Sequence, residues 1–169
     1  MAIKTLQEKF IHGLGDIYDA EHRFLEAQQT MLPNADSETV RTNLETHIAE
    51  TEQQIANLEE VYEILGLTAK RIACDGATGI VKEGDKLLQE TKDVPALTDL
   101  AITGGGSKIE HYEIAAYRGL IAGAEAMGQT DIMQLLAENL QQEELMATKL
   151  EQSMPTLLQK AMQTATAKA

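Results

Sequence analysis

Acidic side chains interrupt two apolar helical stripes in this sequence, and carboxylates in such positions can bind metal ions. The stripe in residues 6–31 has Glu21 near its centre, and the stripe in residues 132–150 has Glu143. A carboxylate on the buried face of a helix must be protonated, paired or bound to a metal, because burying an isolated charge costs too much free energy. Both glutamates therefore need partners.

Two other segments with a helical pattern supply such partners. His47 and Glu50 lie one turn apart beside apolar positions, and Glu110 and Glu113 share one face of a later segment. Carboxylate oxygens with an imidazole suit iron or manganese, and two ions would offset four or five carboxylates in one place. We therefore expect two iron ions as the cofactor, with manganese as the alternative. The predicted metal ligands are Glu21, His47, Glu50, Glu110, Glu113 and Glu143.

The heights of these residues along their helices favour one shared site. With a rise of ~1.5 Å per residue, Glu21 and Glu50 lie about 17 and 20 Å from the turn at Pro33. Glu113 and Glu143 lie about 21 and 18 Å from the second turn, whereas Glu110 lies about 26 Å from it. Glu110 is therefore one turn too far, and the other four match.

Interhelical salt bridges are the competing explanation for each single glutamate. In that case the acids would pair with basic side chains on neighbouring helices and no metal would be needed. The candidate basic partners are Arg23, Arg41, Lys108 and Arg118.

Proline and glycine divide the chain into long helical segments. Alternation of apolar and polar residues, which would indicate strands, is missing throughout the sequence. The expected helices cover residues 5–32, a stretch from the cap at 36–37 to 66, residues 95–127 after a cap at Asp93, 131–153, and a short C-terminal helix that starts at Pro155.

Four long helices joined by two tight turns and one long connector predict an all-α, ferritin-like four-helix bundle. The connector, residues 71–91 with a short helix, would cross the bundle between the second and third helices. We expect a single domain over residues 1–169, with the core bundle at about 5–153. Gly104, Gly105 and Gly106 disfavour helix, but packing can override propensity, so we predict that the third helix continues through them.

Composition and charge exclude several classes of protein. A formal charge of −13 repels phosphate backbones, so we expect no nucleic-acid partner. The N-terminus lacks the apolar core of a secretory signal and no run of about 18 apolar residues occurs, so we expect a cytoplasmic protein with no membrane partner. Cys74 is the single cysteine, which rules out an internal disulfide and a cysteine-based zinc cluster.

The ligand pattern departs from that of standard di-iron bundles, which repeat Glu-x-x-His on two helices. The corresponding positions here hold Gln53 and Met146. His47 and Glu110 are expected to replace the missing imidazoles. The site is thus rich in carboxylate and poor in histidine, which weakens the case for oxygen activation more than the case for metal binding.

The remaining histidines and tyrosines are given secondary roles. His111 points away from Glu110 and is expected in the layer around the site or at an interface, while His12 and His22 are expected at the surface. Tyr18, Tyr112 and Tyr117 are expected to fill the core or to donate hydrogen bonds to inward carboxylates.

Three segments resemble one protein family along nearly the whole chain. HIAETEQQIANLEEVYE, KIEHYEIAAYRGLIAGAEAMG and LLAENLQQEE are similar to the YciE/YciF group of ferritin-like proteins, the DUF892 family. The resemblance implies a ferritin-like bundle, usually a homodimer, associated with bacterial stress responses and without an established reaction. It also places acids at the five predicted glutamate positions with His47 before Glu50. The EHYE string resembles the paired glutamates of rubrerythrins, which supports keeping Glu110 as a ligand.

Three functions remain open at this point. A di-metal oxidoreductase would react with oxygen or peroxide, and it would need electrons from a separate, unidentified protein because no CxxC pair is present. A metal-holding protein would use the same ligands without turnover. A stress-induced structural or interaction protein would retain the bundle with a vestigial site.

Overall fold

Five α-helices and one short 3-10 helix form the computed structural model, which describes residues 2–166 and their side chains as far as residue 163. None of these helices combines the length and the apolar composition needed to cross a membrane. The elements are α1 (Leu6–Met31), η1 (Leu32–Asn34), α2 (Glu38–Ile64), α3 (Asp75–Thr91), α4 (Pro95–Ala126) and α5 (Thr130–Thr166).

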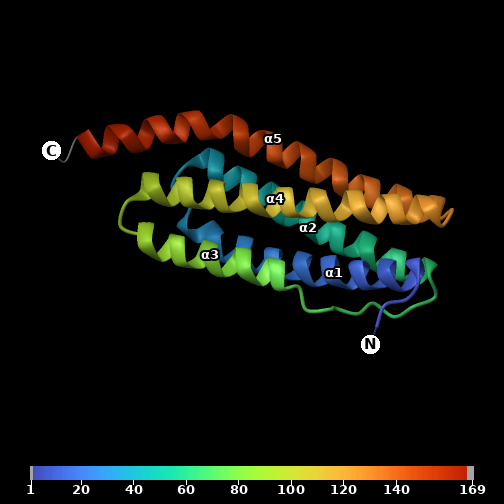
Figure 1. Cartoon of the computed structure of the whole chain (residues 1–169). Helices are drawn as coiled ribbons and strands as arrows, with labels where there is room; N and C mark the ends of the chain where they lie inside the picture. The colour runs from blue at the N-terminus through green and yellow to red at the C-terminus, as the bar shows by residue number, and fades with distance from the viewer. Residues whose placement is uncertain (1, 167–169) are drawn as a thin grey trace.

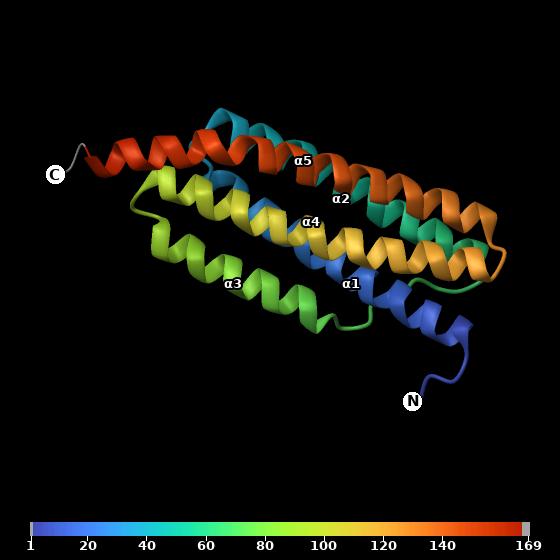
Figure 2. The same ribbon diagram turned by 45° about the horizontal axis from the view of Figure 1, so that its top comes forward.

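Four of the helices, α1, α2, α4 and α5, form a bundle, and α3 packs on its outside against α1 and α4 (Figures 1 and 2). No strand occurs within residues 2–166. The predicted all-α, ferritin-like bundle with a long connection between its second and third helices is confirmed. The helix in that connection was expected to be short, but α3 has 17 residues.

The helix ends follow local sequence signals in most places. Thr5 and Glu8 form a capping box at the start of α1, and Gly66 ends the α2 segment with a φ of 67°, a conformation that favours glycine. The predicted cap at Asp93 was wrong. Val94 occupies that position, without a side-chain hydrogen bond, and Pro95 lies in the first turn of α4.

The connector before α3 is held against α1 by polar contacts. The Ile72 N–H donates to the Gly15 carbonyl over 2.9 Å, and a Cβ on Gly15 would lie 2.7 Å from the Ile72 side chain. Asp19 accepts hydrogen bonds from the Arg71 side chain at 2.8 Å and from the Cys74 N–H at 2.9 Å. Burial alone would raise the pKa of Asp19, but its hydrogen bonds, above all those from Arg23, Cys74 and Arg71, lower it to about 2. Asp19 is therefore an ionised anchor for the connector.

Helix α4 runs without a break through the three consecutive glycines, as predicted. A Cβ on Gly104 or Gly105 would meet nothing within 4 Å, whereas a Cβ on Gly106 would lie 3.1 Å from Leu150 Cδ1. Only Gly106 of the three therefore faces a neighbouring side chain closely.

Helix α5 also continues through Pro155, so the expected separate C-terminal helix was wrong. A proline inside a helix removes one hydrogen bond and costs about 3 kcal/mol. Tertiary contacts offset this cost, because Leu157 is buried in the core and Lys160 lies 2.9 Å from Asp36 and 3.5 Å from Asp99. Packing against the bundle keeps this part of α5 helical.

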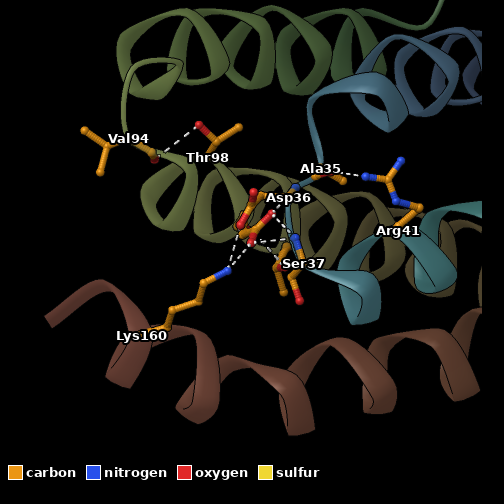
Figure 3. A network of polar contacts seen from close by, with 9 residues as sticks. Ala35, Asp36, Ser37, Arg41, Val94, Thr98 and Lys160 are labelled. Carbon is orange, nitrogen blue, oxygen red and sulfur yellow. Dashed lines mark hydrogen bonds and ion pairs between the residues drawn. The ribbon is translucent and has the colours of Figure 1, made fainter. Parts of the chain in front are cut away.

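The start of α2 is capped by a side chain of another helix. Ser37, the residue before α2, makes no capping bond with its own side chain. Instead, the buried Asp99 of α4 accepts from the Asp36 N–H at 2.9 Å and from the Ser37 N–H at 3.0 Å. Figure 3 shows Lys160 reaching this network from α5 and Arg41 donating to the Ala35 carbonyl. The network ties three helices together at one end of the bundle.

Replacing Asp99 with alanine should lower the free energy of unfolding by about 2 kcal/mol, because two N–H groups at the start of α2 lose a buried acceptor. Urea denaturation of the wild type and of Asp99→Ala measures this loss. Asp36→Asn is the matched control, since it removes only an exposed ion pair and should cost less than about 1 kcal/mol. Equal losses in both variants would contradict the capping role.

Candidate metal centre

Four glutamates and one histidine from all four bundle helices meet in the core. Glu21, Glu110, Glu113 and Glu143 are fully buried, and His47 is 4% exposed. One ligand atom from each of His47, Glu110, Glu113 and Glu143 lies within 4.8 Å of all the others. This spacing lets one ion or a close pair of ions contact several of these side chains at once.

The imidazole of His47 lies between two of the carboxylates. Its Nδ1 is 3.0 Å from Glu110 Oε1, and its Nε2 is 3.8 Å from Glu143 Oε2. Glu110 belongs to the tight group although its height along the helix is one turn off, so the height comparison was wrong for this residue. Glu110 and Glu113 lie one turn apart on the same face of α4. Their side chains bridge this difference in height and reach the same group.

A layer of neutral polar side chains holds the outer edge of the cluster. Tyr117 donates a hydrogen bond to Glu21 Oε1, and Gln54 donates one to Glu143 Oε1. Asn139 in turn donates to the Tyr117 oxygen at 3.0 Å, and Asn57 donates to Asn139 Oδ1 at 2.7 Å. The hydrogen bonds from Asn57 to Asn139, from Asn139 to Tyr117 and from Tyr117 to Glu21 form a series that ends at Glu21 and fixes the position of its carboxyl group, whereas Gln54 fixes Glu143.

The inner atoms of the cluster have no hydrogen-bond partner. Buried polar atoms without a partner are rare in proteins, and ten such side-chain atoms are found among the described residues, eight of them on the predicted ligands. A cation would satisfy atoms that converge in this way. The eight atoms are Glu21 Oε2, His47 Nε2, Glu50 Oε2, both oxygens of Glu110, both oxygens of Glu113, and Glu143 Oε2.

Burial and mutual repulsion make these carboxyls weak acids when no cation is bound. Burial raises the pKa of Glu21 to about 8, and the Glu143 charge adds to the effect. Burial likewise raises the pKa of Glu110 to about 8, with contributions from Glu21 and Glu50. The pKa values of Glu113 and Glu143 are also raised well above 4.5, chiefly by burial. The metal-free cluster therefore retains protons that a bound cation would displace.

The salt-bridge explanation of these glutamates was wrong. Each of the four candidate cations has a different partner, and no lysine or arginine in the described part of the chain forms an ion pair with the cluster. Arg23 pairs with Asp19, Arg41 donates to the Ala35 carbonyl, Lys108 pairs with Glu83, and Arg118 pairs with Glu144.

Glu21 and Glu50 lie at the margin of the tight group. Glu21 is fully buried and its charge acts on Glu113, whereas Glu50 is only partly buried and contributes charge near Glu110. Gln53 is exposed and donates to Asn57 at 2.9 Å, so it does not reach the cluster.

The other residues considered from the sequence lie elsewhere. His111 is exposed, 3.4 Å from Glu151, so it does not lie in the layer around the site, and an interface role stays a prediction. Tyr18 donates to Glu59, and Tyr112 donates to Asp16 while its oxygen lies 2.8 Å from the Cys74 sulfur. Of the three tyrosines, only Tyr117 donates to a carboxylate of the cluster.

Sequence reasoning missed the polar layer, above all Gln54 and Asn57. A partial signal existed, because Gln28 and Asn139 interrupt the same apolar stripes as Glu21 and Glu143. Gln28 lies 3.3 Å from His47 Nδ1 and accepts from the Thr51 hydroxyl. Gln54 gives no such signal, since only the packing of α2 against α5 brings it to Glu143.

Comparisons with known proteins identify relatives that match this chain over nearly its full length. Residues 5–163 match the family described as Domain of unknown function (DUF892). Protein YciF of Escherichia coli (strain K12) is 32% identical over 151 residues, covering 89% of this chain and 90% of that protein. The crystal structure of the E. coli stress protein YciF matches with a TM-score of 0.88 and 30% identity, over 94% of this chain and 99% of that one. YcfI from Rhodopseudomonas palustris, for which a structural role has been suggested, matches with a TM-score of 0.83 and 37% identity, over 88% and 94%.

The metal-free protein should become less stable as pH rises from about 4.5 toward about 8. A carboxyl whose pKa is raised by folding contributes its stability below the unfolded value of 4.5, and loses it as pH passes through the folded value, about 8 for Glu21 and Glu110. Urea denaturation in the presence of a chelator at several pH values measures the slope. The Glu110→Gln variant should show a shallower fall, and an unchanged slope in that variant would contradict the assignment.

Proposed function

We propose that this chain, which belongs to the DUF892 family, holds two iron or manganese ions in its buried cluster and uses them in peroxide- or oxygen-linked redox chemistry during bacterial stress. The stress context comes from the E. coli relative, which is described as a stress protein. The observation that supports metal binding most directly is the convergence of buried oxygen and nitrogen atoms without hydrogen-bond partners.

Charge balance supports a pair of ions in preference to one. Four fully buried carboxylates face one another with no lysine or arginine of the described chain paired to them. Two divalent cations would neutralise all four carboxylates, whereas a single ion would neutralise two and leave the others to retain protons. Oxygen-rich ligands with one imidazole fit iron or manganese better than zinc.

The ligands differ in how many of their atoms are free to bind. Glu21 and Glu143 each use one oxygen for a hydrogen bond and leave one free, so each would bind through a single oxygen. Glu110 and Glu113 leave both oxygens without hydrogen-bond partners, so each would offer two ligand atoms. His47 would bind through Nε2 while Nδ1 faces Glu110. Tyr117 and Gln54 fix the orientations of Glu21 and Glu143 before any ion binds.

When bound by these residues, an iron pair would supply one-electron redox chemistry toward small oxidants. The protein's own groups hold the carboxylates in place and exclude bulk water from them. A redox cycle would also require an external electron donor, because the described residues contain no second metal-ligating cluster of at least three groups and the chain has a single cysteine.

A structural or interaction protein with a vestigial site is the second candidate. Two observations favour it: Gln53 points away from the cluster where standard di-iron bundles have a histidine, and a structural role has been suggested for the relative YcfI. Metal content and reactivity distinguish the two candidates.

Glu143→Gln should lower the metal content of protein purified without chelator, and should reduce the rise in melting temperature on adding ferrous ion. The amide keeps the volume of the side chain but removes the charge that an ion would neutralise. Glu144→Gln is the matched control, since Glu144 is the next residue of α5 and pairs with Arg118 at the surface. Equal metal content in both variants and the wild type would contradict the assignment.

Ferrous-loaded protein should oxidise in one round when peroxide is added, because a carboxylate-rich site stabilises ferric ions more than ferrous ions. Stopped-flow absorbance of the ferric product measures the reaction, and a second round should require added reductant. Two bound ferrous ions with no absorbance change on mixing would favour the structural candidate.

Homodimer formation, as the family resemblance implies, is a further part of the proposal. The exposed Ala115 and Gly119 on α4 offer a smooth surface for a second copy. Sedimentation at micromolar concentration should show a species of twice 18.5 kDa, and a species of 18.5 kDa would contradict it.

A further inference from the structure

A small apolar pocket lies in the bundle core beside His47. It leaves about 20 Å³ for the centre of a water-sized molecule, which is enough for one small molecule. All four bundle helices contribute to its wall, and partly exposed Asn43 and Gly106 lie at the same pocket as the buried histidine. The apolar side chains that line it include Met31, Leu44, Ile109, Met146 and Leu150.

Gly106 keeps this space open. It is the one residue of the glycine triplet that lines the pocket, and a Cβ there would lie 3.1 Å from Leu150 Cδ1. Gly104 and Gly105, by contrast, would place a Cβ in open space. A larger side chain at position 106 would therefore fill the pocket or push Leu150 into it.

The chemistry of the wall selects uncharged, apolar molecules. The Thr103 hydroxyl already donates to the Asp99 carbonyl at 2.9 Å, and the Gln28 amide is engaged with His47 and Thr51. A hydrated metal ion would lose most of its water in this pocket and would gain few ligands from a mostly apolar wall, in which His47 is the one residue also predicted to bind metal, at a large cost in free energy. A diatomic gas carries no such cost, because it gives up few hydrogen bonds in leaving water.

We propose that this pocket binds dioxygen and delivers it to the His47 side of the cluster, with Gly106 as the residue that keeps the pocket open. The delivery step rests on the proposed function, whereas the binding of dioxygen in the pocket does not. Metal ions must then reach the glutamates by another route.

Dissolved dioxygen is paramagnetic, so it can be located in the metal-free protein by methyl relaxation in NMR under oxygen pressure. The methyl of buried Met146 should relax faster with oxygen in the wild type and in the Gly105→Val control, and this effect should be lost in Gly106→Val. Gly106→Ala should give a partial loss, and it provides a milder variant if valine prevents folding. Exposed Met162 reports oxygen in solvent. No oxygen effect at Met146 in the wild type, or equal losses in the variants at 105 and 106, would overturn the proposal.

A second measurement tests delivery in ferrous-loaded protein. Two ferrous ions give one electron each to dioxygen, which takes up two protons and leaves as hydrogen peroxide. Oxidation by dioxygen should be severalfold slower in Gly106→Val than in Gly105→Val at equal bound ferrous ion, and equal rates would overturn delivery. If the wild type binds no ferrous ion but Met146 still senses oxygen, the proposed function fails and the pocket assignment stands.

Discussion

The burial of four carboxylates, with His47 beside them but no paired lysine or arginine among the described residues, is the constraint on which the rest of the bundle depends. An ionised carboxylate in a protein core is tolerated only when donors or cations compensate it. The cluster around Glu113 meets this demand in part: Tyr117 and Gln54 satisfy its outer oxygens, and the inner atoms remain without hydrogen-bond partners. The apolar core must supply enough stability to carry this cost in the metal-free protein.

Two other buried acids in the same molecule show what full compensation looks like. Asp19 accepts hydrogen bonds from Arg71 and the Cys74 N–H, and Asp99 accepts from two backbone N–H groups at the start of α2. Asp19 holds the connector before α3, and Asp99 holds the start of α2, where Ser37 makes no capping bond with its side chain. The local sequence alone gives weak signals for the structure of both segments. The contrast with the glutamate cluster separates structural acids from acids that are left available for a ligand.

The bundle has a layered order along its axis. The Asp99 network closes one end, an apolar layer with the pocket beside Gly106 follows, and the glutamate cluster with its polar belt lies beyond it. The pocket and the cluster share His47 and Gln28, so the apolar and polar layers are in contact through these side chains. This order places an apolar compartment directly beside the buried carboxylates, while α3 covers α1 and α4 on the outside.

The sequence by itself determined most of the helices and most of the residues of the buried cluster, because both depend on local periodicity and punctuation. Glu21 and Glu143 could be recognised since each interrupts an apolar stripe of its own helix, and the family resemblance supported Glu110. Tertiary structure decided what depends on distances between helices: the contact of Gln54 with Glu143, the capping of α2 by Asp99, and the helical course of α5 past Pro155. The tertiary structure also excluded salt bridges from Arg23 and Arg118 to the cluster glutamates. Each arginine pairs with a carboxylate that lies beside it in space, and spacing along a single helix does not predict this choice of partner.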